Sequence, residues 1–151
     1  MRVVRYLALF PLLAIFSFAF ADSPEIYSHK KRGAVKGIDV VAYYSLPQGA
    51  KAVKGSNDYT YEWKGATWKF SSQENLDKFR ESPEAYAPQY GGYCAFAVAH
   101  GFTTSPRPDN WRIVDGKLYL NNNRSSFKKW LVDQDNKIAK ADENWPKVLE
   151  K

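Results

Sequence analysis

Hydrophobic and polar positions alternate most clearly in the two segments 59–63 and 66–70. A Lys64-Gly65 pair separates them, and a two-residue loop containing glycine is typical of a tight β-hairpin. In that register three pairs of apolar side chains face each other: Trp63 with Ala66, Tyr61 with Trp68, and Tyr59 with Phe70. Successive side chains of a strand point to opposite faces, so the intervening polar residues lie on the other side. The pattern predicts a hairpin with an aromatic core face and a polar outer face.

A second hairpin is predicted around Asp115-Gly116, because Asp-Gly is among the strongest short signals for a two-residue turn. The segments 111–114 and 117–120 flank that pair. Four of their apolar side chains share one face in the resulting register: Trp111, Ile113, Leu118 and Leu120.

Helical signals follow the first hairpin. Ser71 and Glu74 have the spacing of a capping box, which satisfies free backbone N–H groups at a helix start. The helix that it predicts carries Leu76 and Phe79 on one side. Pro83 then predicts a second short helical turn, since proline is well tolerated at the first helical position.

Further helices are predicted in the second half of the chain. In the segment 90–101, a glycine pair indicates a turn, an alanine-rich stretch a buried helix, and Gly101 its end. After the second hairpin, apolar residues at i, i+3 and i+4 predict another helix: Phe127, Trp130 and Leu131. A C-terminal helix is expected to cover the core with Ile138, Trp145, Val148 and Leu149.

Two hairpins packed against several short helices make a small single-domain α+β fold. Specific patterning begins at Gly37, so we expect the domain to span 37–151. The preceding residues 22–36 are polar and predict an irregular N-terminal arm.

The first 21 residues have the features of a secretory signal peptide. A basic start, with Arg2 and Arg5, precedes 16 uncharged residues that end in Ala19-Phe20-Ala21. That run is shorter than the roughly 20 residues that span a bilayer. Cleavage after Ala21 would leave no stable membrane anchor. We therefore expect an exported protein, periplasmic or secreted.

Charge and cysteine content narrow the function. Loss of Arg2 and Arg5 on cleavage would lower the net charge from +6 to +4, which gives no reason to expect a nucleic-acid partner. Cys94 is the one cysteine of the chain. A single cysteine cannot form an internal disulfide, so in an exported protein it indicates metal ligation, a reactive thiol or a partner's thiol. The alternative is an inert, buried thiol.

The residues that could assist Cys94 are His100 and His29. Cys94 lies near a predicted helix start, where the helix dipole favours the thiolate. His100 follows six residues later, and on an unbroken helix it would lie on a different face. A shared site needs the helix to end early; otherwise His100 contacts the helix C-terminus. His29 lies in a basic segment, and nothing in the sequence places it near Cys94.

Other chemistries find no support in the sequence. It has no nucleophile elbow of a serine hydrolase, no phosphate-binding glycine loop and no Cys-x-x-Cys pair. Two histidines and one cysteine also cannot supply a four-ligand Cys/His zinc site. The sequence assigns no enzyme activity, and the lack of these catalytic motifs favours a protein that is not an enzyme.

Several motifs together resemble the YHS domain family. They are Gly-Ile-Asp-Val-Val-Ala-Tyr at 37–43, the hairpin at 61–70, Ser-Gln-Glu-Asn-Leu-Asp-Lys-Phe at 72–79, and 83–95, which ends in Gly-Gly-Tyr-Cys-Ala. The last segment is similar to an exported branch of that family, and the resemblance runs from about residue 36 to the end.

The resemblance implies metal handling, because YHS domains are similar to cysteine-bearing metal-sensing modules and occur attached to copper and heavy-metal transporters. Where metal-binding relatives carry cysteines, this chain has Ala42, Ser71 and Asn75. The resemblance therefore leaves Cys94 as the remaining thiol.

Three hypotheses follow, in decreasing order of preference. The first is a soft-metal module, with copper as the candidate ion, Cys94 as ligand and His100 or His29 assisting. The second is a redox protein in which the Cys94 thiol reacts with a thiol partner. The third is a non-catalytic module that binds a ligand or partner through its aromatic surface.

Overall fold

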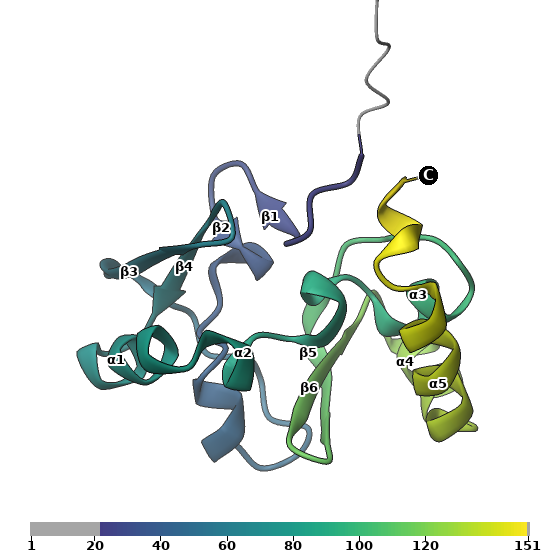
Figure 1. Cartoon of the computed structure of the whole chain (residues 1–151). Coiled ribbons are helices and arrows are strands. Elements are labelled where there is room, and N and C mark those ends of the chain that lie inside the picture. Colours follow the sequence, from purple (N-terminus) through teal and green to yellow (C-terminus); the bar gives the residue numbers. More distant parts are fainter. Residues whose placement is uncertain (1–21, 151) are drawn as a thin grey trace, which may run out of the picture.

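The computed structural model describes residues 22–150 (Figure 1). The predicted signal peptide, 1–21, lies outside the described residues. None of the helices that the structure describes is long and apolar enough to cross a membrane.

The architecture is α+β, as predicted, with short helices and three two-stranded antiparallel sheets in the described part of the chain. The strands are β1 (Ser28–His29), β2 (Gly33–Ala34), β3 (Ser56–Trp63), β4 (Ala66–Phe70), β5 (Arg107–Val114) and β6 (Lys117–Asn121). The α-helices are α1 (Gln73–Glu81), α2 (Pro83–Tyr86), α3 (Ala95–Ala99), α4 (Arg124–Leu131) and α5 (Gln134–Asn144). Short 3-10 turns cover Val35–Gly37, Ala42–Ser45, Gln89–Gly92 and Lys147–Glu150.

The β3–β4 hairpin confirms the predicted turn and the first two pairs of facing residues. Trp63 lies opposite Ala66 and Tyr61 opposite Trp68. The third predicted pair is wrong, because an irregularity between Ser56 and Thr60 shifts the register and places Ser56 opposite Phe70. A bulge of this kind inserts extra residues into one strand and moves every later pair.

The β5–β6 hairpin pairs Trp111 with Leu120 and Ile113 with Leu118, as predicted. It lies between the β3–β4 hairpin with α1 on one side and the helices α3, α4 and α5 on the other (Figure 1). Its residues contribute to both hydrophobic clusters of the core. Trp111, Leu118 and Leu120 pack into the first cluster, with the β3–β4 hairpin and α1. Tyr119, on the opposite face, packs into the second cluster with α3, α4 and α5. The hairpin therefore joins the two halves of the core.

Helix α1 begins one residue later than the capping-box prediction. Its N-cap is Ser72, whose side chain accepts a hydrogen bond from the Asn75 N–H. The reason is that the Ser71 hydroxyl is already engaged, donating to Asp39 at 2.7 Å. Pro83 begins α2, as predicted.

The C-terminal part differs from the single helix that we expected. Helix α5 ends at Asn144, Trp145 follows in extended conformation, and Val148 and Leu149 lie in a separate 3-10 turn. All the same, Val148 is buried and the predicted residues pack into the second cluster.

Residues 22–36, expected as an irregular arm, pack against the body of the protein. They contain β1 and β2, and they bury Ile26, Ala34 and Val35. The Tyr27 N–H donates to the carbonyl of Gly91 at 2.9 Å, which ties the segment to the turn before Cys94.

Candidate functional site

Cys94 lies at the N-cap of α3, and Tyr93 alone separates it from the turn Gln89–Gly92. That turn holds Tyr90, Gly91 and Gly92 at positive φ, which reverses the chain before the helix. The Cys94 side chain is only 1% exposed. The predicted turn, buried helix and end at Gly101 are thus confirmed, and the helix is short.

The buried Cys94 thiol contacts a polar side chain in an otherwise apolar interior. Its Sγ is 3.6 Å from Oδ1 of Asn121, the last residue of β6. The same Oδ1 accepts a hydrogen bond from the Phe96 N–H at 3.0 Å, so the amide group of Asn121 has a fixed orientation. The Cys94 N–H donates to the carbonyl of Thr104 at 3.1 Å. The end of β6 and the loop after α3 therefore both contact Cys94.

Two polar atoms of these neighbours lack a hydrogen-bond partner. They are Nδ2 of Asn121, a residue with no exposed surface, and Oγ1 of Thr104. A buried donor without an acceptor costs about 1–3 kcal/mol. Such groups in a native protein commonly mark a bound water, an ion or a functional role.

His100 is the C-cap of α3 and is exposed. Its Nδ1 lies 2.7 Å from the carbonyl oxygen of Phe96, and its ring packs against the Phe96 ring with centroids 4.3 Å apart. The helix does end early enough to allow a shared site. The imidazole nevertheless contacts the helix C-terminus, which is the alternative that the sequence left open.

His29 is the last residue of β1, directly before the turn to β2. Its Nδ1 accepts hydrogen bonds from the N–H groups of Lys31 and Arg32 at 3.2 and 3.3 Å. This imidazole therefore stabilises its own turn. The structure brings neither histidine into a hydrogen bond with Cys94.

Among residues 22–150, no three His, Cys, Asp or Glu side chains are grouped so that they could hold a metal ion. Cys94 supplies one soft donor, and Asn121 and Thr104 add only a hard amide oxygen and a hydroxyl. The donor set fits attachment of a soft ion through one sulfur; it does not fit a chelate of three protein ligands.

A carboxylate occupies the centre of the region where the resemblance placed the missing cysteines. Asp39 has no exposed surface and accepts five hydrogen bonds of 2.7 to 3.1 Å. Oδ1 accepts from the N–H groups of Val41 and Ala42, so Asp39 caps the turn that follows it. Oδ2 accepts from the N–H and hydroxyl of Ser71 and from the side-chain amide of Asn75. Ala42, Ser71 and Asn75 therefore all bind one buried anion.

The sequence did not reveal the hydrogen bonds from Ser71 and Asn75 to Asp39. It also did not reveal the contact between Asn121 and Cys94. Asp39 interrupts the apolar run Ile38–Val41, and an acidic residue in such a run has to find donors if it is buried. Asn121 extends the alternation of Leu118 and Leu120 by one position, on the opposite face. The sequence thus marks Asp39 and Asn121 as unusual positions, but it does not identify the distant residues that they contact.

The second cluster contains tyrosines that bind protons more tightly than usual. Burial, followed by the charges of Asp142 and Asp115, raises the pKa of Tyr119 to about 12. Burial also raises the pKa of Tyr90, and its hydroxyl donates to Asp142 at 2.8 Å.

These shifts predict alkaline destabilisation. A phenol whose folded pKa exceeds its usual 10.0 adds stability below that pH, and the stability is lost as the pH rises toward about 12. We expect the free energy of unfolding, measured in urea, to fall across this range. Tyr90→Phe removes one titrating group and should make the fall shallower; an unchanged slope would contradict a role for Tyr90.

Residues 47–90 match the model of the YHS domain. No curated protein and no solved structure matches the chain. The matched range takes in β3, β4, α1 and α2 and ends four residues before Cys94, so it is shorter than the resemblance noted from the sequence. The aromatic hairpin and the helix that packs on it are thus the part of this chain that the YHS domain model matches.

Proposed function

We propose that the protein is an exported soft-metal-binding module in which Cys94 is the soft ligand and a copper-type ion the preferred metal. The YHS domain is associated with metal binding, which supports the general class. The observation that carries the assignment to Cys94 is that two residues in contact with it, Asn121 and Thr104, have buried side-chain polar atoms without a hydrogen-bond partner.

The chemistry of the site favours a soft ion. Thiolate sulfur selects Cu(I) over hard cations. In the metal-free protein the Cys94 thiol is the donor to Asn121 Oδ1, and metal binding would replace the thiol proton with the ion. Asn121 holds the sulfur in place through its contact with Oδ1, while Cys94 alone would hold the ion.

The remaining coordination has to come from another molecule. Cys94 is the single cysteine, and the single methionine is Met1, which the predicted cleavage removes. A partner's thiol is the donor that matches a soft ion. At 1% exposure, the Cys94 side chain can reach such a donor only when the surrounding loop opens.

The test is an anaerobic Cu(I) titration of the protein against a competing chromophoric chelator, with a small thiol present as external donor. We expect one copper per chain, and we expect Cys94→Ser to abolish this binding. His29→Ala and His100→Ala are the matched controls and should bind copper as the unchanged protein does. Copper binding that survives Cys94→Ser with the same stoichiometry and affinity would contradict the proposal.

A further inference from the structure

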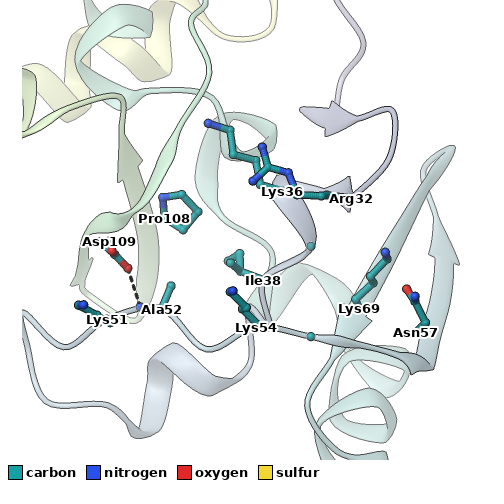
Figure 2. Close-up of a pocket in the computed structure, with 12 residues that line it drawn as sticks. Arg32, Lys36, Ile38, Lys51, Ala52, Lys54, Asn57, Lys69, Pro108 and Asp109 are labelled. Atoms are coloured by element: carbon teal, nitrogen blue, oxygen red, sulfur yellow. Dashed lines mark hydrogen bonds between the residues drawn. The ribbon is translucent and has the colours of Figure 1, made fainter.

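A basic pocket lies between the β3–β4 hairpin and the start of β5 (Figure 2). Its volume is about 540 Å³, within the usual range for small-ligand sites. The lining comes from four segments: the stretch around Lys36–Ile38, the stretch 51–57, Lys69 of β4 and the start of β5 at Pro108 and Asp109.

Five cationic side chains surround this pocket, and they have no anionic partner. They are Arg32, Lys36, Lys51, Lys54 and Lys69. None of them forms an ion pair within residues 22–150. The one acidic lining residue, Asp109, uses Oδ1 to accept a hydrogen bond from the Ala52 N–H at 2.9 Å (Figure 2).

The cations repel one another. Burial, together with the positive charges of Arg32 and Arg107, lowers the pKa of Lys36. A bound anion would relieve this repulsion, because opposite charges a few Å apart attract while like charges destabilise the empty site.

The backbone brings the cations to one place. Ile38 pairs with Lys54 in an isolated antiparallel bridge, and the Gly55 N–H donates to the carbonyl of Gly37 at 2.9 Å. Gly55 in turn lies so close to β4 that an added Cβ would be 2.4 Å from the backbone of Lys69. These approaches fix Lys54 and Lys69 on neighbouring segments, and Figure 2 shows both at the pocket.

We propose that this pocket binds a small molecule carrying phosphate groups. Arginine and lysine are the usual phosphate-binding side chains, and five unpaired cations exceed what a single carboxylate would neutralise. Ile38, Ala52 and Pro108 add apolar lining for the rest of an organic ligand. None of the Cys94 neighbours named above lines this pocket, so the inference is independent of the proposed metal function.

Inorganic pyrophosphate is a suitable first probe. Its binding can be measured by calorimetry and by amide chemical shifts at about 0.15 M salt, where weak surface attraction is screened. We expect saturable binding that shifts the amides of Lys36, Lys54, Gly55 and Lys69. The double variant Lys54→Gln/Lys69→Gln should bind about tenfold or more weakly, since each removes a charge-assisted contact.

The matched control is Lys128→Gln/Lys129→Gln on α4, which removes the same charge from exposed residues outside the pocket. It should bind pyrophosphate as the unchanged protein does. Equal weakening in the two double variants, or no saturable binding, would overturn the proposal because only general attraction to a basic surface would remain.

Phosphate can be part of a free metabolite or of a lipid headgroup, and cosedimentation with phosphatidylglycerol vesicles separates these sources. Pyrophosphate binding without sedimentation supports a free ligand. Sedimentation that the Lys54→Gln/Lys69→Gln variant loses supports the headgroup in the same pocket. Sedimentation that this variant retains, with no pyrophosphate binding, would overturn the proposal.

Discussion

Replacing Asp39 with alanine is expected to lower the free energy of unfolding by about 3–5 kcal/mol. The change removes the acceptor of five hydrogen bonds. Val41 N–H, which is buried, and the N–H groups of Ala42 and Ser71 would lose their partner, and each such loss costs about 1–3 kcal/mol where water cannot replace it. Since small domains have only about 5–15 kcal/mol of stability, the effect is a large fraction of the total.

Urea denaturation measures this effect, and Asp109→Ala is the control. Asp109 is an exposed carboxylate with a single hydrogen bond, to the Ala52 N–H, so its loss should cost less than about 1 kcal/mol. Asp39→Asn should fall between the two, because the amide keeps one acceptor oxygen and turns an N–H₂ group toward donors. Equal stability of Asp39→Ala and Asp109→Ala would show that the network carries no net stabilisation.

The same network explains how this chain can dispense with the cysteines that the family resemblance led us to expect. In the structure, Asp39 connects the turn at 41–42 to the start of α1, through Ser71 and Asn75. A buried carboxylate with a full set of donors can hold these segments together without a metal ion. We therefore interpret this half of the molecule as structurally self-sufficient, and look for metal chemistry only at Cys94.

The hairpins could be predicted from sequence because their information is local. Lys64-Gly65 and Asp115-Gly116 define the turns, and the alternation of apolar residues then defines the faces. The bulge before Thr60 could not be predicted, since it depends on where the far end of β3 contacts the rest of the molecule. Likewise, the start of α1 moved to Ser72 because Ser71 is held by a residue 32 positions away.

The candidate site at Cys94 likewise combines a local feature that the sequence predicts with distant contacts that it does not predict. Sequence placed Cys94 at the start of a short buried helix, which is a local property, and this is confirmed. Its partners Asn121 and Thr104 come from another hairpin and another loop, and no spacing rule connects them to Cys94. The basic pocket was equally invisible, because its five cations are scattered between residues 32 and 69 and are gathered only by the fold.

The glycine pair before Cys94 has a structural explanation of its own. An added Cβ at Gly91 would lie 1.7 Å from the carbonyl oxygen of Glu25, and one at Gly92 would lie 2.9 Å from a methyl group of Val35. The N-terminal segment passes directly over this turn, where the Tyr93 hydroxyl also donates to the carbonyl of Pro24 at 2.8 Å. The glycines of the Gly-Gly-Tyr-Cys segment are thus required for packing, and only its cysteine enters the proposed metal site.

Gly91→Ala is therefore expected to destabilise the protein by at least about 3 kcal/mol. The left-handed conformation at φ +61 costs an alanine about 1–2 kcal/mol. Relief of the clash with Glu25 must in addition displace residues 24–27 and break the hydrogen bond from Tyr27 N–H to the Gly91 carbonyl. Urea denaturation gives the total, and amide hydrogen exchange at Tyr27 and Val35 reports whether the N-terminal segment detaches.

Gly116→Ala is the matched control, because Gly116 also has positive φ, +74, but an added Cβ there meets nothing within 4 Å. It should cost only the conformational part, about 1–2 kcal/mol, and leave exchange at Tyr27 unchanged. If the two variants lose the same stability, the close approach of Glu25 has no energetic weight. The larger loss at Gly91 would instead show that the N-terminal segment holds the turn that positions Cys94.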